Sequence, residues 1–402
     1  MHVNHVLKVC IGGVNLMRSL ASTKWGGDPL ILSTLYKAII RSRLEYGLWI
    51  MMPLPVVTMS SLQRIAYQAY RLILGALRSS PTNALTIEAG ETSLETRAKL
   101  LGTRFAVRSV SRVGGMWNDK INKLIITYEN LQGSRAPLII GIYKNIRPYI
   151  DYIYKDRDLG VHSLVYETRQ WRPIVKRIPG AMSRKGTCTE QNNIIRAEVE
   201  NYVKEEWSAS HQFYTDGSIR KERGESVACG IYSPTMALEE HIHVPEQLSI
   251  FGAEAFAVSL AIRVCLERGI TKAAILTDSL STVEAIKEFS FKTRTHPYVL
   301  EIIELLHRAH TRGLEIHLAW IPGHTGIKGN EKADQLAAMG HGDEIIDIEI
   351  PGEDIFRILQ RNIQQEWESE WKTTSKLKGI NYAKIQPSIQ KSIPFTGILT
   401  QN

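Results

Sequence analysis

Four acidic residues have the types and positions needed to bind a hard metal ion. They are Asp216, Glu254, Asp278 and Asp334. Asp216 and Asp278 each close a short strand-like run, and carboxylates at strand ends face the crevice where open α/β sheets bind ligands. Oxygen donors without His or Cys favour Mg²⁺, for which Mn²⁺ can substitute. The sequence therefore predicts that these four carboxylates converge on one metal site.

Glu254 is the most informative of the four because of its position on a helix predicted over about 252–268. At about 100° per residue, the polar residues of this helix lie about 140° to 220° away from Glu254. These polar residues are Ser259, Arg263 and Glu267. Glu254 therefore lies on the apolar face, where an unpaired carboxylate is costly and needs a cation, a proton or a hydrogen-bond donor. An acid favoured by the helix dipole is the alternative, and the position on the wheel argues against it.

Each of the other three acids, taken singly, also has an ordinary structural interpretation. Asp216 suits a turn, and Asp278 could cap a helix that begins near Ser281. Asp334 could be a solvated helix residue. The predicted metal site therefore depends on the four acids occurring together.

The segments around these acids follow a mixed α/β order between residues 211 and 341. Hydrophobic periodicity and turn residues predict strands and helices in the order βββαβααβα. The strands are predicted at 213–216, 227–232, 238–244, 273–277 and 315–321, and the helices at 252–268, 281–289, 297–311 and 329–339. This order predicts a mixed sheet with helices on its faces.

We expect four parts in the chain. They are a mainly α-helical region (1–115), a basic and partly ordered linker (116–208), the α/β domain (209–342), and a tail helix followed by irregular chain (343–402). Asp28 followed by Pro29 predicts the start of a helix in the first part. In the tail, apolar residues recur every four positions at Ile355, Leu359, Ile363, Trp367 and Trp371. This stripe predicts a helix that docks on a domain face, and binding of a partner by the helix is the alternative.

Charge is divided unevenly between the two halves of the chain. Residues 1–200 have a net charge of +14 and the remainder −6, within a total of +8. Arg64, Arg71 and Arg78 repeat every seven residues on a helix predicted to end at residue 77. Each Lys or Arg near a phosphate releases counterions, so a contact between the first half and nucleic acid is predicted. A solvated basic surface is the alternative.

Cysteine usage and the apolar runs bear on the compartment. The four cysteines lie far apart without zinc or disulfide spacing, which favours a reducing intracellular compartment, cytoplasmic or nuclear. The apolar run at 48–57 contains Pro53 and Pro55 and is shorter than the ~20 residues of a membrane span. No signal peptide is expected at Met1. We therefore expect no membrane partner.

Four motifs resemble those of type 1 ribonuclease H, in that family's order, across residues 211–341. The motifs are Tyr214-Thr215-Asp216-Gly217-Ser218, Ala253-Glu254-Ala255, Thr277-Asp278-Ser279, and the run from Trp320 to Asp334 that contains Pro322-Gly323-His324-Thr325-Gly326. The resemblance implies a five-stranded mixed sheet of order 3-2-1-4-5. It also implies that Asp216, Glu254, Asp278 and Asp334 hold two Mg²⁺ ions.

The resemblance further implies catalytic cleavage of the RNA strand of an RNA/DNA hybrid by two-metal-ion hydrolysis. His324 matches a histidine implicated in proton transfer or product release. Substrate contacts are implied near Gly217, Ser218, Ser279 and Asn330. A catalytically inactive remnant that binds nucleic acid or protein, and a transposase-type nuclease, are the alternatives. The run Gly-x-x-Gly-Asn-Glu-x-Ala-Asp and the fourth acid favour ribonuclease H.

The flanking segments are similar to the last part of non-LTR retrotransposon polyproteins. The similar segments are 25–29, 41–47, 74–82 and the tail with Trp367 and Trp371. No Tyr-x-Asp-Asp polymerase motif occurs, so no polymerase activity is expected. Many bacterial relatives carry a basic helical protrusion where this chain has only 292–297. The basic first half is therefore predicted to supply additional grip on the hybrid.

Overall fold

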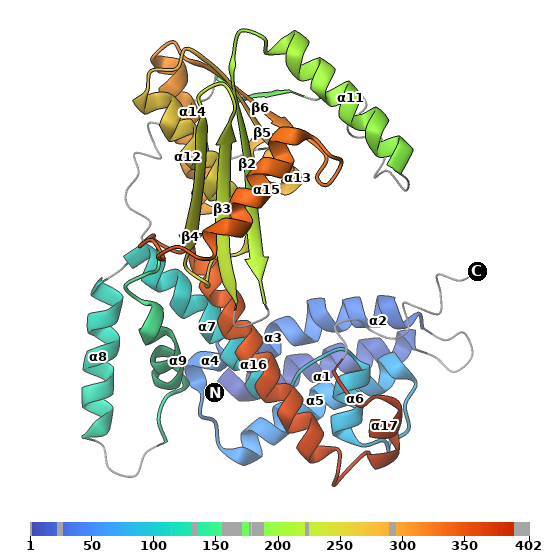
Figure 1. Cartoon of the computed structure of the whole chain (residues 1–402). Coiled ribbons are helices and arrows are strands. Elements are labelled where there is room, and N and C mark those ends of the chain that lie inside the picture. The colour runs from blue at the N-terminus through green and yellow to red at the C-terminus, as the bar shows by residue number, and fades with distance from the viewer. Residues whose placement is uncertain are drawn as a thin grey trace. The chain divides into compact units, whose positions relative to one another are not determined.

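The structure is a computed structural model (Figure 1). It describes residues 2–21, 27–113, 115–130, 135–154, 171–176, 178, 189–221, 225–288 and 295–389. The predicted features at Trp25 and at residues 292–294 lie outside these described residues.

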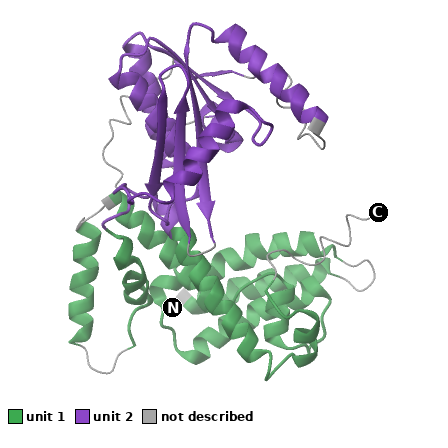
Figure 2. Ribbon diagram, in the orientation of Figure 1, with its two compact units in different colours: residues 1–150, 356–402 green, residues 151–355 purple. Residues whose placement is uncertain are grey.

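The chain divides into two compact units (Figure 2). Unit 1 comprises residues 1–150 and 356–402, and unit 2 comprises residues 151–355. Unit 1 is therefore assembled from segments on both sides of unit 2 in the sequence. This division differs from the four expected parts because the tail packs with the first helices.

A six-stranded sheet of order β1-β6-β5-β2-β3-β4 forms the centre of unit 2. Its strands are β1 (Ile174–Lys176), β2 (His211–Arg220), β3 (Ser226–Ser233), β4 (Leu238–Val244), β5 (Lys272–Thr277) and β6 (Glu315–Trp320). β2 pairs antiparallel with β3 and parallel with β5. The five strands expected from the sequence occur in the order 3-2-1-4-5, which confirms the mixed α/β fold class. The sixth strand, β1, pairs with β6 and corrects the expected number, because three residues are too few to show an alternation.

Helices cover both faces of this sheet. They are α11 (Thr189–Glu206), α12 (Ile250–Glu267), α13 (Leu280–Lys287), α14 (Pro297–Thr311) and α15 (Lys328–Gly340). In Figure 1, α15 lies in front of the sheet, and α12 and α14 lie behind it. A Cβ added to Gly217 of β2 would meet α12, whereas one added to the neighbouring strand's Gly230 would meet α15. Side-chain positions that alternate along the strands therefore face opposite layers of helices, with α12 on one side of the sheet and α15 on the other.

Helix α11 is part of unit 2, although its residues fall in the expected linker. Ile195, Val199, Val203 and Trp207 recur every four residues and pack into one buried cluster with residues of β5, β6 and α15. Trp207 Nε1 donates a hydrogen bond to His317 Nδ1 at 2.9 Å. The hydrophobic face of α11 is therefore buried against the sheet, as in any helix with a stabilising core contact.

Unit 1 is helical in its described residues. Its elements are α1 (His2–Leu20), α2 (Pro29–Leu35), the π-helix η1 (Tyr36–Arg41), α3 (Ser42–Glu45), α4 (Leu48–Met51), α5 (Val56–Leu74), α6 (Thr82–Glu88), α7 (Leu94–Val113), α8 (Gly115–Glu129), α9 (Leu138–Ile146) and the 3₁₀ turn η2 (Arg147–Tyr149). Asp28 Oδ1 accepts a hydrogen bond from Leu30 N at 2.7 Å, so the predicted cap is confirmed.

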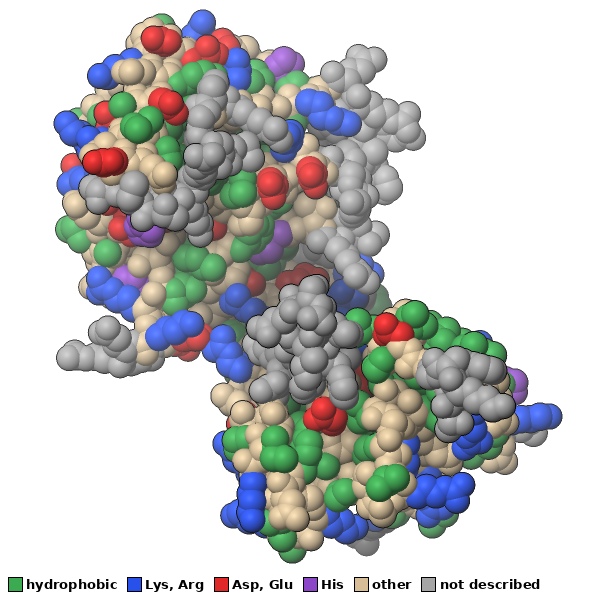
Figure 3. Space-filling view, turned by 90° about the vertical axis from the view of Figure 1, so that its right-hand side faces the viewer, with side chains coloured by type: hydrophobic (Ala, Val, Ile, Leu, Met, Phe, Trp, Pro, Cys, Tyr) green, Lys and Arg blue, Asp and Glu red, His purple; other side chains and the backbone are tan. Residues whose placement is uncertain are grey.

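Helix α5 corrects the predicted arginine stripe. The helix ends at Leu74, and Gly75 follows in the left-handed conformation with φ of 61°. Arg78 therefore lies beyond the helix that carries Arg64 and Arg71. On the face drawn in Figure 3, the Lys and Arg side chains of unit 1 are dispersed and do not form one patch. The contact of the first half with nucleic acid stays a prediction.

The tail forms α16 (Gly352–Thr374), which carries the chain from unit 2 into unit 1, and α17 (Ile380–Ile385). Its stripe residues Leu359, Ile363 and Trp371 are buried, which confirms docking on a domain face. Trp371 packs with Ala84 and Ile87 of α6. α17 occupies a part of the tail where irregular chain is expected. Within the described residues, none of the helices is long and apolar enough to cross a bilayer.

Candidate active site

Asp216 lies within β2, whereas the sequence predicts that it closes a strand before a turn. The parallel pairing of β2 with β5 ends at Thr215 opposite Thr277. The antiparallel pairing with β3 continues through Asp216 opposite Gly230 as far as Arg220. Gly217 and Ser218 continue the strand because β3 remains beside them. Asp216 therefore stands level with the carboxyl end of β5, where ligands bind in open α/β sheets.

Glu254 lies in the first turns of α12, beside the backbone of β2. A Cβ on Gly217 would be 3.1 Å from both the Cγ and the backbone N of Glu254, so glycine permits this close approach. The Ser279 hydroxyl donates a hydrogen bond to Glu254 Oε2. Ser279 also caps α13 by accepting from Thr282 N at 3.3 Å. Ser279 therefore ties Glu254 to the segment that carries Asp278.

Asp278 directly follows β5 and is held from two sides. Asn330 Nδ2 donates to Asp278 Oδ2 at 3.2 Å, and Trp320 Nε1 donates to the Asp278 carbonyl at 2.9 Å. A Cβ on Gly323 would lie 2.6 Å from Asp278 Oδ2. The loop between β6 and α15 passes so close to the carboxylate that glycine is required there.

His324 and Asp334 come from this same loop and from α15. His324 is exposed and has φ of 55°, a left-handed conformation that is uncommon outside glycine. Asp334 is half-buried on α15. Burial raises the pKa of Asp278, and the Asn330 hydrogen bond and the charge of His324 oppose that rise. His324 is therefore close enough to Asp278 to influence the pKa of its carboxyl group.

The four acids form one electrostatic neighbourhood. Burial, followed by the negative charges of Asp278, Asp334 and Glu254, raises the pKa of Asp216 to about 8. The Gly217 N–H, 2.7 Å from Asp216 Oδ1, opposes this rise. Burial also raises the pKa of Glu254. Like charges held together in this way favour the neutral forms unless a cation is supplied.

The donor set fits a hard divalent cation. Four carboxylates from β2, α12, the β5–α13 loop and α15 provide oxygen ligands, which Mg²⁺ and Mn²⁺ prefer. Across the described residues, no three His, Cys, Asp or Glu side chains are arranged closely enough to form a ready-made metal site. The structure thus gathers the four predicted positions without placing them at ligand distances.

The residues predicted to contact substrate differ in accessibility. Asn330 and Ser279 are only 3% and 4% exposed, and they bond to Asp278 and Glu254. Ser218 is half-buried, and its hydroxyl lies 3.1 Å from His341 Nε2. Two of the four residues therefore orient acids, and their substrate contacts stay predictions.

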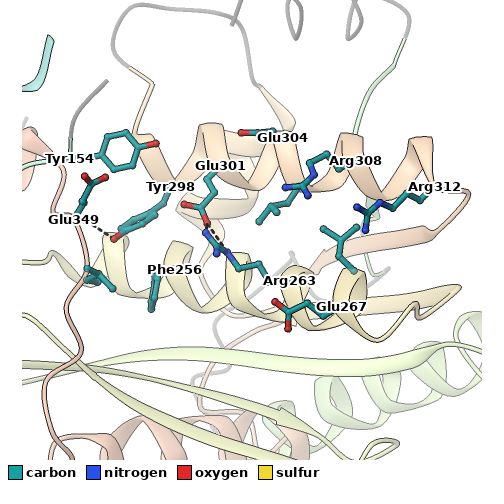
Figure 4. Close-up of a pocket in the computed structure, with 13 residues that line it drawn as sticks. Tyr154, Phe256, Arg263, Glu267, Tyr298, Glu301, Glu304, Arg308, Arg312 and Glu349 are labelled. Carbon is teal, nitrogen blue, oxygen red and sulfur yellow. Dashed lines mark hydrogen bonds and ion pairs between the residues drawn. The ribbon is translucent and has the colours of Figure 1, made fainter. Parts of the chain in front are cut away.

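A groove of about 760 Å³ lies along α12 and α14 (Figure 4). Arg263 Nη2 pairs there with Glu301 Oε1 at 2.6 Å, and the Tyr298 hydroxyl bonds to the Glu349 carbonyl. None of the residues that line the groove is one of the four acids. Because opposite charges pair within the groove, we assign the candidate chemistry to the acids and not to the groove.

Two features beside the acids have no counterpart in the sequence predictions. Arg196 of α11 lies against the His324 loop, with Nη1 3.4 Å from the position of a Cβ on Gly326. His341, immediately after α15, bonds to Ser218. The four-residue spacing from Ile195 onward could have predicted α11. The contact of His341 carries no sequence signal, because its partners come from distant strands.

Comparisons with known proteins match the α/β part of the chain. A family model described as RNase H matches residues 208–341. Ribonuclease H1 of Rattus norvegicus is 30% identical over 178 residues, which are 40% of this chain and 59% of the relative. The human protein of the same name is 33% identical over 139 residues, 32% of this chain and 48% of the relative. The chain thus spans about half the length of the curated relatives it matches.

Solved structures also match about a third of the chain. The prototype foamy virus protease-reverse transcriptase has 21% identity and a TM-score of 0.28, covering 34% of this chain and 21% of that chain. RNase H1 from Halobacterium salinarum NRC-1 has 19% identity and a TM-score of 0.25, covering 34% of this chain and 99% of that chain. The RNase H family model therefore matches the part of the chain that carries the four acids, residues 208–341, and the curated relatives that align with the chain are ribonucleases H1.

Proposed function

We propose that this protein is a Mg²⁺-dependent endonuclease that cleaves the RNA strand of RNA/DNA hybrids. One observation carries the proposal: Asp216 is buried among three other carboxylates, within the segment that matches the RNase H family. Burying like charges together costs stability, so a purely structural role does not explain the arrangement. Binding of divalent cations does explain it.

Asp216, Glu254, Asp278 and Asp334 would hold two Mg²⁺ ions. Bound ions of this kind supply an activated water and stabilise the leaving oxygen in phosphodiester hydrolysis. The chain's own residues orient the ligands: Asn330 directs Asp278 through its amide. The Ser279 hydroxyl directs Glu254.

His324 is the candidate for proton transfer. Its side chain is exposed to solvent on a loop that passes beside Asp278. The two ring nitrogens of an imidazole can accept a proton and donate one. We assign His324 to protonation of the leaving group or to release of the product.

We also propose that the chain derives from the last part of a non-LTR retrotransposon polyprotein. The motifs on both sides of the RNase H domain support this origin. Trp371 from the tail packs with Ala84 and Ile87, so segments before and after the domain share one core, as expected of segments that evolved together.

An intracellular location, cytoplasmic or nuclear, is consistent with the free, buried thiols of Cys10, Cys229 and Cys265.

The test is a cleavage assay on the full chain in Mg²⁺ with labelled RNA/DNA hybrid, duplex DNA and duplex RNA. We expect cleavage of the RNA strand of the hybrid alone, with 3′-hydroxyl and 5′-phosphate ends. Binding of the hybrid without cleavage would indicate an inactive remnant. Cleavage of duplex DNA would indicate a transposase-type nuclease, and either outcome contradicts the proposal.

A further inference from the structure

A chain of hydrogen bonds runs from Ser218 across the sheet to the segment after α15. His341 Nε2 lies 3.1 Å from Ser218 Oγ, and His341 Nδ1 lies 2.7 Å from Ser226 Oγ. His243 Nε2 lies 3.0 Å from the same Ser226 Oγ, and His243 Nδ1 lies 2.9 Å from the Asp343 carbonyl oxygen. Both ring nitrogens of both histidines are therefore engaged.

The Asp343 carbonyl sets the donor and the acceptor of each hydrogen bond in this series, because a carbonyl oxygen can only accept. His243 Nδ1 must therefore donate to it, and in a neutral imidazole this leaves Nε2 as an acceptor. The single hydroxyl proton of Ser226 then goes to His243 Nε2. As a result, His341 Nδ1 donates to Ser226, and His341 Nε2 accepts the proton of Ser218.

Burial and a neighbouring cation favour the neutral form of His341. Burial, followed by the positive charge of Arg220, lowers the pKa of His341. Arg220 comes from β2, and its Nη2 donates to the Ala338 carbonyl of α15 at 2.7 Å. The carboxylate of Asp343 is engaged by His241 Nδ1 at 2.6 Å.

Ser218 lies on the same side of β2 as Asp216, because side chains two residues apart on a strand share a face. With its proton donated to His341, Ser218 Oγ presents only lone pairs to an approaching substrate. We propose that His341 is a positioning residue that fixes Ser218 as a hydrogen-bond acceptor for one ribose 2′-hydroxyl of the RNA strand. This inference rests on the proposed function. A deoxyribose lacks the donor, so the contact would distinguish RNA from DNA.

The tautomer can be measured directly. In the metal-free full chain, the ¹⁵N chemical shifts of the imidazole report which nitrogen of His341 carries the proton. We expect the proton on Nδ1 in the neutral ring. A proton on Nε2 would overturn the proposal, since Ser218 would then have to accept from His341 and keep its own proton for other partners.

The substrate contact is tested by hybrids in which one ribose at a time is replaced by 2′-deoxyribose. Affinity is measured by fluorescence anisotropy in EDTA. For the wild type we expect one position at which the replacement raises Kd about three- to tenfold, the range of one hydrogen bond. In Ser218→Ala, which leaves both histidines intact, the penalty at that position should vanish.

Two substitutions at His341 separate positioning from packing. His341→Asn keeps a donor near the Nδ1 position but has no group that reaches Ser218, so it should lose the 2′-deoxy penalty. His341→Gln places an amide oxygen near the Nε2 position and should retain it. His241→Asn, on the same side of β4 as His243 but bonded to Asp343, is the matched control and should behave as the wild type.

Persistence of the full penalty in folded His341→Asn and Ser218→Ala, or its absence in the wild type, overturns the proposal. Because affinity is measured without divalent cation, a protein that binds hybrid and does not cleave it contradicts the proposed function while leaving this test intact. A wild type that binds no hybrid overturns both.

Discussion

Both units bury an acidic side chain, and the two acids have opposite surroundings. In unit 1, Glu91 is 4% exposed, and Arg41 Nη1 lies 2.9 Å from its Oε1. In unit 2, Asp216 is 7% exposed, and its charged neighbours include Asp278 and Asp334. Glu91 is paired with a cation, whereas Asp216 lies among charges of its own sign. Burial alone therefore does not mark a functional acid, whereas the sign of the neighbouring charges does.

The largest effect is expected from removing the charge of Asp216. Asp216→Asn should reduce hybrid cleavage by roughly 10³-fold or more, because a ligand of the proposed cations loses its charge. Steady-state cleavage in Mg²⁺ measures this loss. Glu91→Gln, at the neutralised acid of unit 1, is the control and should keep the parent rate. Near-parent cleavage by Asp216→Asn would remove this residue from the active site.

The buried acid of unit 1 is expected to matter for stability. Glu91→Ala removes the carboxylate that Arg41 Nη1 contacts, although Arg41 keeps Glu45 at 3.3 Å, and should lower the free energy of unfolding by about 2 kcal/mol. Urea denaturation followed by circular dichroism measures the change. Glu95→Ala, at an exposed acid of α7, is the control and should change stability little. An unchanged stability of Glu91→Ala would refute the structural role of the pair.

Removing the charge of Asp216 is expected to raise the stability of the protein, whereas removing Glu91 is expected to lower it. Its pKa is raised to about 8 in the folded protein, so folding favours the protonated form. The folded state is therefore stabilised relative to the unfolded chain at low pH, and this contribution is lost as pH rises from about 4 to 8. In metal-free buffer at pH 8, Asp216→Asn should be more stable than the wild type by on the order of 1–3 kcal/mol.

The matched control for this stability effect is Asp347→Asn, at an exposed acid of unit 2. Thermal unfolding from pH 5 to pH 8 with EDTA should show a wild type that loses stability with rising pH more steeply than Asp216→Asn. Equal slopes for the two proteins would show that Asp216 carries no unfavourable charge.

Sequence patterns could predict most of unit 2, because strand alternation and turn residues are local signals. The extent of β2 could not be predicted, since Gly217 and Ser218 form strand or turn according to whether β3 stays beside them. Strand β1 is too short to show a pattern.

For the candidate site, the sequence could predict the four acids but not the hydrogen bonds that orient them. The four acids stand out by residue type and by their positions in the elements. The hydrogen bonds that orient them do not, because Asn330 reaches Asp278 across 52 residues of sequence. The chain through His341 joins β2, β3, β4 and the segment after α15, and no local pattern encodes such a set of partners.

The smallest effect is expected from the basic surface of unit 1. Arg64 is exposed on α5, and Arg64→Gln should weaken hybrid binding about two- to threefold and reduce the salt slope of log Kd by up to about one. Anisotropy titrations at several salt concentrations measure both quantities. Arg268→Gln, at an exposed arginine of unit 2, is the control. Equal salt slopes for Arg64→Gln and the wild type would contradict a phosphate contact at Arg64.

Binding of Mn²⁺ tests most directly whether the four acids form one cation site. Electron paramagnetic resonance can count bound Mn²⁺ in the full chain with a hybrid whose RNA backbone cannot be hydrolysed, and in Asp216→Asn/Asp278→Asn under the same conditions. We predict two bound ions in the wild type and a loss of affinity of at least about tenfold in the double variant. Equal Mn²⁺ binding by the two proteins would contradict the account, because the ions would then be bound without the two carboxylates that the double variant lacks.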